Sequence, residues 1–429
     1  MNDNDKQSLP RLRFQSFKTS GPWVFQPLGK LAQRSIRKNV DGKITRVLTN
    51  SAEYGVVDQR DFFEKDIANQ GNLEGYYIVE EGSYVYNPRI SAMAPVGPIS
   101  KNKIGLGVMS PLYTVFKFNN NKNDFYAYYF KSTHWHKYMR QVSSTGARHD
   151  RMSISNNAFM ELPLPVSTPE EQQKIADCLS SLEDVLTLEA QKLDALTTYK
   201  RGLLQQLFPC EGERVPRLRF PEFRNAGEWK VKTLSHYVKS LDAGVSVNSG
   251  DRPAGSEEIG ILKTSCVSSG SFDQTENKVV AVPEEIARVK EPVCADTIII
   301  SRMNTIALVG ANAYVEKDIP TLFLPDRLWA AKATGNGSMR FLAYVLGSEQ
   351  GRKNLSILAS GSSGSMKNIG KSEVLAIRIT APCIEEQQRI AELLTSLDKL
   401  ITAQTQKLKI IKTHKKGLMQ QIFPILNEA

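Results

Sequence analysis

The chain repeats itself, and this repeat constrains its fold more than any other feature of the sequence. Residues 170–173 (EEQQ) return at residues 385–388, and the QQLFP of residues 205–209 returns as QQIFP at residues 420–424. Both pairs of anchors are separated by the same offset, and the copies between them align without a gap. About half of the aligned positions are identical.

A second repeat opens each half of the chain. The PRLRF of residues 10–14, followed by Trp23, returns at residues 216–220, followed by Trp229. The two repeats have different offsets because the stretch between the anchors is longer in the second half. The sequence therefore predicts a tandem duplication, with similar frames around divergent inserts.

Composition places the chain among globular proteins. With 429 residues, 41% apolar and 23% charged, it is long enough for two or three cores. Its polar N-terminus does not resemble a signal peptide, and no apolar run is long enough to span a bilayer. The five cysteines are odd in number, widely spaced and never arranged as C-x-x-C, which argues against structural zinc. We therefore expect a cytoplasmic protein that does not contact a membrane.

The formal net charge of +10, with a pI near 9.2, is the first indication of a partner. An excess of lysine and arginine favours a polyanion such as DNA, through Coulomb attraction and counterion release. Charge alone is also consistent with a basic protein whose excess merely aids solubility.

The repeated segments predict two long helices. Thr168 can cap the first helix, with Pro169 in its first turn and Glu171 at the capping-box position, although Cys383 replaces the capping threonine in the second copy. About 40 residues at about 1.5 Å each give a helix near 60 Å long, too long for one small core. Although each could be an ordinary amphipathic surface helix, we expect the two to pack on each other as an antiparallel coiled-coil spacer with a pseudo-two-fold axis. The apolar residues of the packing stripe are Ile175, Leu179, Leu182, Leu186, Leu193, Ile390, Leu394, Leu397, Ile401 and Leu408.

The inserts instead carry the pattern of short strands and turns. β-Branched and aromatic runs bounded by turn residues occur at residues 76–79, 84–86, 113–116 and 297–300. Each insert then turns helical before the long helix. The fold class is therefore α+β, with two compact mixed domains of similar topology.

Residues with base-reading chemistry follow strands in both inserts. Arg89 and Arg302 lie at comparable places, and Asn304 follows the second; arginine pairs well with guanine and asparagine with adenine. Polar, glycine-containing loops at residues 144–151 and 360–368 suit phosphate contact. A surface salt bridge, a loop cap or a plain connector is the competing reading of each. The candidate DNA-binding residues are Arg89, Lys101, Lys103, Arg148, Arg151, Lys263, Arg302, Asn304, Arg327, Lys367 and Asn368.

Catalytic signatures are missing from the sequence. There is no G-x-x-x-x-G-K-[ST] phosphate loop, no G-x-S-x-G elbow and no N-P-P-[YF] run of an amino-methyltransferase. His134 and His136 could ligate a metal, but an aromatic-rich helix surface is the better interpretation. We therefore expect a binding protein that has no catalytic, cofactor or metal site of its own.

Taken together, these features resemble the specificity (S) subunit of type I restriction-modification systems. The resemblance rests on the [ST]-x-x-E-E-Q-Q-[KR]-I-A helix start, the G-L-[LM]-Q-Q-[LI]-F-P helix end, the PRLRF…Trp opening and the alternation of divergent inserts with repeated helices. It covers nearly the whole chain. It implies two target recognition domains, each of which reads one half of a bipartite, asymmetric DNA sequence, and helices that set the spacing between the halves.

The resemblance also implies partners. The implied partners are double-stranded DNA, two methyltransferase subunits, and restriction subunits that join through the complex. S-adenosylmethionine, ATP and Mg are expected on those partners rather than on this chain. The expected organisation is a frame at residues 1–24, recognition domain 1 at 25–165, a spacer helix at 166–215, recognition domain 2 at 216–380 and a second spacer helix at 381–429. Three alternatives stay open: a coiled-coil scaffold without DNA specificity, a modification-only specificity subunit, and a DNA enzyme whose active site has no recognised motif.

Overall fold

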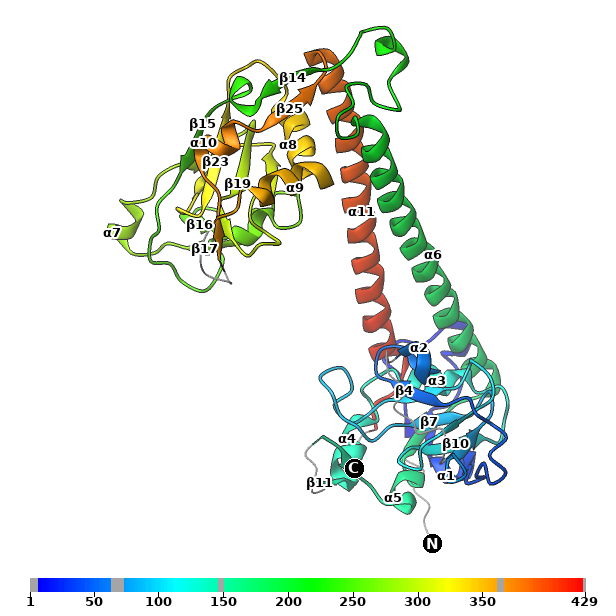
Figure 1. Cartoon of the computed structure of the whole chain (residues 1–429). Helices are drawn as coiled ribbons and strands as arrows, with labels where there is room; N and C mark the ends of the chain where they lie inside the picture. Colours follow the sequence, from blue (N-terminus) through cyan, green and yellow to red (C-terminus); the bar gives the residue numbers. More distant parts are fainter. Residues whose placement is uncertain (1–6, 63–72, 146–149, 361–365, 427–429) are drawn as a thin grey trace. The chain divides into compact units, whose positions relative to one another are not determined.

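The computed structural model of the chain describes residues 7–62, 73–145, 150–360 and 366–426 (Figure 1). The chain forms two compact units: residues 1–191 with 406–429 make unit 1, and residues 192–405 make unit 2. Two long helices, α6 (Pro169–Leu207) and α11 (Ile384–Ile422), each contribute one part to each unit. This mixed helix and strand content agrees with the expected fold class.

Unit 1 is built around a four-stranded antiparallel sheet with the strand order β3-β10-β7-β8. Smaller sheets, β1-β2-β13, β4-β5, β6-β9 and β11-β12, surround it. The strands are β1 (Gln7–Ser8), β2 (Trp23–Pro27), β3 (Ala32–Arg34), β4 (Leu48–Ser51), β5 (Gly55–Asp58), β6 (Tyr77–Val79), β7 (Tyr84–Tyr86), β8 (Ile99–Lys101), β9 (Gly107–Met109), β10 (Thr114–Phe118), β11 (Ser144–Thr145), β12 (Met152–Ser153) and β13 (Pro163–Val166). The short helices are η1 (Gln15–Phe17), α1 (Leu28–Leu31), α2 (Gln59–Phe62), α3 (Asp124–Tyr129), α4 (His136–Val142) and α5 (Asn156–Met160).

Unit 2 repeats this plan. Its antiparallel sheet has the order β15-β23-β19-β21, so both central sheets place their four strands in the chain order first, fourth, second, third. The remaining sheets are β14-β25, β17-β16-β22-β18 and β20-β24. The strands are β14 (Lys230–Thr233), β15 (Val238–Ala243), β16 (Gly260–Leu262), β17 (Asn277–Val279), β18 (Pro292–Val293), β19 (Thr297–Ser301), β20 (Met303–Asn304), β21 (Asn312–Val315), β22 (Ile319–Phe323), β23 (Leu328–Ala333), β24 (Lys367–Asn368) and β25 (Arg378–Ala381). The short helices are η2 (Pro221–Phe223), η3 (Leu234–His236), η4 (Thr264–Val267), α7 (Pro283–Ile286), α8 (Met339–Gly347), α9 (Glu349–Ile357) and α10 (Lys371–Leu375).

The central strand of each domain is buried on both faces. In β19, Ile298 and Ile300 face one hydrophobic cluster while Ile299 faces another. In β7, Tyr84 and Tyr86 face one cluster and Val85 faces another. Because side chains alternate across a strand, apolar residues at every position indicate two covered faces.

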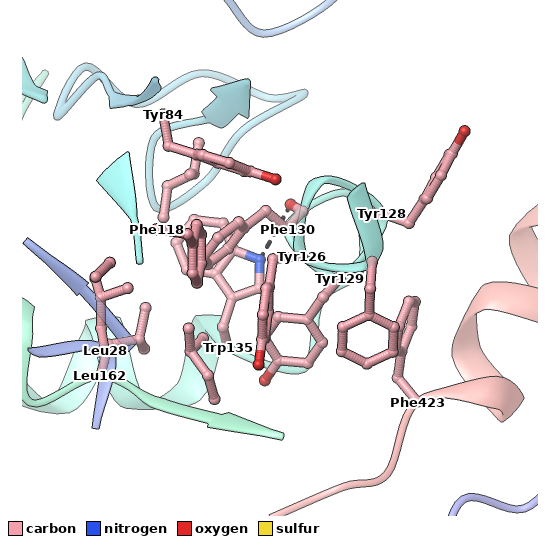
Figure 2. Packing of buried hydrophobic residues seen from close by; sticks show 14 of the residues in the cluster. Leu28, Tyr84, Phe118, Tyr126, Tyr128, Tyr129, Phe130, Trp135, Leu162 and Phe423 are labelled. Carbon is pink, nitrogen blue, oxygen red and sulfur yellow. Dashed lines mark hydrogen bonds between the residues drawn. The ribbon is translucent and has the colours of Figure 1, made fainter. Parts of the chain in front are cut away.

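The end of α11 completes the core of unit 1. Phe423 packs its ring against that of Tyr129 of α3, with the centroids 5.5 Å apart (Figure 2). It also packs against Phe125 of the same helix, with the centroids 5.3 Å apart. In unit 2 the equivalent residue, Phe208 at the end of α6, packs against Trp229 and Phe341. Each unit therefore needs the end of a long helix to close its core.

A buried ion pair fastens each long-helix start to the PRLRF frame. The Arg13 guanidinium donates to both carboxylate oxygens of Glu171 at 2.6 and 2.7 Å, and the Trp23 indole donates to the same carboxylate at 3.1 Å. Arg219 donates in the same way to Glu386, at 2.7 Å to each oxygen. The carboxylate of Glu171 therefore binds Arg13, whereas the amide N–H of Glu171 donates to the capping Thr168 hydroxyl at 3.3 Å. Only that half of the expected capping box is formed.

Replacing Glu171 with glutamine should destabilise unit 1 by about 3–5 kcal/mol, because the buried Arg13 guanidinium loses its charged partner. The Glu171 side chain is fully buried and that of Arg13 is 8% exposed, so water cannot take the place of the carboxylate. Denaturant unfolding of the full chain would measure the loss of stability. The control is Glu170→Gln, which makes the same change at the exposed neighbouring residue. Equal unfolding midpoints for the two variants would contradict the assignment.

Candidate nucleic-acid interface

In unit 1, the loop that follows the central strand pairs with the polar loop near residue 150. After β7, Arg89 forms an antiparallel bridge with Arg151. The Ile90 amide donates to the Asp150 carbonyl at 2.9 Å, and the Met152 amide donates to the Pro88 carbonyl at 2.9 Å. Two candidate residues that lie far apart in the sequence are thus held side by side by backbone hydrogen bonds.

Unit 2 has the same arrangement. After β19, the two-residue strand β20 pairs with β24, so Met303 lies opposite Asn368 and Asn304 opposite Lys367. The Ile369 amide also donates to the Arg302 carbonyl at 3.1 Å. The structure therefore brings Arg302, Asn304, Lys367 and Asn368 together, at the place in unit 2 that Arg89 and Arg151 occupy in unit 1.

The two arginines that follow the central strands differ in their electrostatic surroundings. Arg89 is 62% exposed and lies 3.7 Å from the Asp150 carboxylate, which Arg151 also approaches at 3.9 Å. An exposed ion pair of this kind contributes little to stability. The Arg89 guanidinium can therefore exchange Asp150 for another partner at a small cost in free energy. Two arginines share one carboxylate, which leaves this edge of unit 1 with an excess of positive charge.

Arg302 lies over the indole ring of Trp329, with its guanidinium carbon 5.8 Å from the ring centroid. Lys371 approaches the same ring at 6.0 Å. Within the described part of the chain, no carboxylate lies within ion-pairing distance of Arg302. Three buried polar atoms here also lack a hydrogen-bond partner among the described residues: Arg302 Nε, Asn368 Oδ1 and Trp329 Nε1. Since buried polar atoms are nearly always hydrogen-bonded, this cluster can accept an external partner.

A pocket of about 430 Å³ lies beside Arg89 and Arg151. Polar side chains form its wall. The side-chain amide of Asn87 donates to the backbone carbonyl of Asn50 at 2.9 Å, and the hydroxyls of Thr49 and Tyr113 are 3.0 Å apart. The Asn50 side chain in turn donates to the Val85 carbonyl of the central strand at 2.7 Å. The pocket is therefore rigidly attached to the sheet, as a recognition surface requires.

The other candidates are more scattered. Lys101 pairs with Asp124 at 2.9 Å, and Lys263 lies 3.5 Å from Glu276. The exposed Arg327 contributes its carbonyl, which accepts from the Arg302 amide at 3.0 Å. The Asn304 side chain is occupied locally, because it donates to the Ser301 hydroxyl and accepts from the Thr305 amide. Lys103 is exposed, and Arg148 lies outside the described residues.

The two candidate metal ligands pack against aromatic rings. His134 lies near Tyr129 and Phe423 and within 3.0 Å of the Ser132 hydroxyl, while His136 meets the edge of Trp135. Burial, with help from Arg140 and His134, lowers the pKa of His136 to about 4. No cluster of three His, Cys, Asp or Glu side chains that could hold a metal occurs among the described residues.

The predicted stripe residues of the long helices divide between the two cores. Ile175 and Leu179 belong to the core of unit 1, and Ile390, Leu394 and Leu397 to that of unit 2. Leu408 is buried, whereas the remaining four are half-buried: Leu182, Leu186, Leu193 and Ile401.

Equivalent ion pairs join the helices within each unit. In unit 1, Glu183 of α6 pairs with Lys415 of α11; in unit 2, Asp398 of α11 pairs with Lys200 of α6. These four residues occupy matching positions of the repeat. Only the structure shows that these lysines are paired.

The chain is similar to known specificity subunits. The family model described as the type I restriction modification DNA specificity domain matches residues 40–198 and 228–413. The type I restriction enzyme MjaVIII specificity subunit of Methanocaldococcus jannaschii is 26% identical over 334 residues, which cover 75% of this chain and 74% of that protein.

Solved structures show the same fold. The S subunit of a type I restriction-modification system from M. genitalium aligns with a TM-score of 0.58 at 13% identity, covering 97% of this chain and all of that one. A chain from a structure of type I R-M complex assembly and conformational transition aligns with a TM-score of 0.55 at 14% identity, covering 93% and 97%. Across the described residues, no helix is both long enough and apolar enough to cross a membrane.

Proposed function

Because the chain belongs to the family of type I restriction-modification DNA specificity subunits, we propose that it reads a bipartite, asymmetric DNA target with one half-site per recognition domain. Family membership implies DNA, methyltransferase subunits and restriction subunits as partners. We further propose that two methyltransferase subunits dock on this chain and that S-adenosylmethionine, ATP and Mg bind to the partners. In this role the chain supplies sequence recognition and no catalytic step.

The observation that carries this proposal is the pair of equivalent ladders beside the central sheets. Both domains present a loop after the central strand, paired with a polar loop, but with different side chains: Arg89 and Arg151 in one, Asn304 and Lys367 in the other. Two domains that recognise different base sequences need a similar backbone arrangement that carries different hydrogen-bonding side chains.

We also propose that α6 and α11 form an antiparallel coiled-coil spacer between the two recognition domains. The domains then have the limits predicted from the sequence. The matching pairs Glu183–Lys415 and Asp398–Lys200 support it, because each joins one long helix to the other. A helix of 39 residues is about 58 Å long at about 1.5 Å per residue. Helices of this length can separate two DNA-reading surfaces by more than one turn of the duplex.

The purified chain should neither methylate nor cleave DNA alone, and methylation should appear when a methyltransferase partner is added. Incorporation of labelled methyl groups into duplex DNA would measure this, with each protein alone as the control. Turnover by the chain alone would identify an enzyme. Methyl transfer that proceeds without any sequence preference in the complex would instead favour a scaffold.

Replacing Arg302 with alanine should cost about 1–3 kcal/mol of binding to the recognised site and relax one base position, if its free guanidinium pairs with a base. Arg302→Lys should fail to restore the preference, since an ammonium cannot make the planar two-point contact. Competition binding with single-base variants of the target would measure the effect, and Arg378→Ala, an exposed arginine on β25, is the matched control. Equal weakening for all sequences would mean that Arg302 contacts phosphate.

A further inference from the structure

A groove of about 830 Å³ lies between recognition domain 1 and the end of α11, entirely within unit 1. Its charged lining consists of six lysines and two glutamates, an excess of four positive charges. The lysines are Lys101, Lys103, Lys131, Lys412, Lys415 and Lys416, and the glutamates are Glu53 and Glu183. Such an excess over so small an area attracts an anion.

Three of these lysines are already paired. Lys131 and Lys415 both donate to Glu183, and Lys101 donates to Asp124 at 2.9 Å. Burial alone would raise the pKa of Glu183, but the hydrogen bonds from the two lysines prevail and lower it to about 2. The floor of the groove is therefore a fixed ionic network, which holds the end of α11 against domain 1.

The other three lysines have no such partner. Among the described residues, no carboxylate lies within ion-pairing distance of Lys103, Lys412 or Lys416, and all three are exposed. Lys412 and Lys416 are four residues apart on α11, so they lie on the same face of that helix. At the matching positions of α6 the residues are Thr197 and Arg201, so this pair of lysines is particular to α11.

The groove is continuous with the proposed reading site of domain 1. Ala52 and Pro98 line both the groove and the pocket that holds Arg89 and Arg151. A positively charged path therefore leads from the candidate base-reading arginines to the unpaired lysines of α11. This continuity favours a nucleic-acid strand over a protein segment, because a strand that leaves the reading site must carry its phosphates onward along the surface.

We propose that Lys103, Lys412 and Lys416 hold the sugar-phosphate backbone of the DNA that adjoins the half-site read by domain 1. This rests on the proposed function of the chain. The contact is independent of sequence, so it positions the duplex on the helices and contributes affinity without choosing bases. It also makes α11 a DNA-contacting element rather than a spacer alone.

The test compares the full chain, alone and with its methyltransferase partner, with the triple variant K103Q/K412Q/K416Q. Each phosphate contact contributes about 0.9 to the slope of log affinity against log salt, so the slope should fall by about 2 to 3. At physiological salt, affinity should drop on the order of 10- to 100-fold for specific and scrambled duplexes alike. The methylated motif should stay the same, and the triple Lys→Arg variant should bind as the unaltered chain does.

The matched control is K18Q/K174Q/K409Q, which removes the same charge from exposed lysines of unit 1 outside the groove. An equal loss in this control, or an unchanged salt slope in the groove variant, would overturn the proposal. Loss of methyltransferase co-purification with intact DNA binding would also overturn it, by showing that the groove holds a protein segment. If the unaltered chain and its complex bound no DNA, the proposed function itself would fail.

Discussion

Exchange of residues 25–160 for the matching segment of another family member should replace one half of the methylated DNA motif and leave the other half unchanged. The reason is that each unit has its own pair of loops proposed to read bases and its own buried core. Sequencing of methylated adenines in cells that carry the chimera and the methyltransferase would reveal both halves of the motif.

The exchange must preserve the core that α11 completes. Phe423 packs on Tyr129 (Figure 2). It also packs on Phe125, so the donor segment needs aromatic residues at those two places. The matched experiment exchanges residues 230–375 and should alter the other half-site alone. A chimera in which both half-sites change would show that the two domains do not read independently.

A fragment that ends near Arg214 should form a homodimer and direct methylation to an interrupted palindrome. The fragment lacks Met419, Ile422 and Phe423, which complete the core of unit 1. A second copy can supply the equivalent residues of α6, namely Leu204, Leu207 and Phe208. Exposure of large apolar side chains costs about 1.5–3 kcal/mol each, which favours this association. Two identical halves must then read identical half-sites in opposite orientation.

Charge pairing favours the same dimer. Glu183 and Glu189 pair with Lys415 and Lys407 of α11 in the full chain. The equivalent residues of a second α6 are Lys200 and Lys192, so every pair can re-form. A dimer of C-terminal halves is expected to be weaker, since Gln404 stands at the position that matches Glu189.

Sedimentation and methylation sequencing would test the fragment, and the variant Leu204→Asp with Phe208→Asp should be monomeric and inactive with the methyltransferase. A monomeric unaltered fragment would contradict the prediction. So would a dimer whose complex still methylates the full asymmetric site.

Local sequence patterns were sufficient to predict the two long helices and several of the buried strands. The β-branched and aromatic runs at residues 84–86 and 297–300 predicted β7 and β19, and the repeated apolar stripe predicted two long helices. Helical periodicity is a local property of the sequence, so the apolar stripe alone was enough to predict each long helix. The duplication predicted that the two domains share a topology. The central sheets of the two units have the same connectivity.

Contacts between distant residues could not be predicted in this way. Arg13 and Glu171 both belong to repeated motifs, and the recurrence of both as Arg219 and Glu386 is a signal that could have suggested the pair. The lysine groove gave no such signal, because Lys103 and Lys412 are brought together only by the closing of α11 on domain 1. The bridge between Arg89 and Arg151 likewise depends on how two loops meet.

Long-read sequencing of genomic DNA from cells that express this chain with its methyltransferase partner tests the central claim most directly. The account predicts one methylated motif with two unlike specified halves, separated by a gap of unspecified bases. Cells that express the methyltransferase alone should lack that motif. A single continuous motif, or methylation that is the same with and without this chain, would contradict the account.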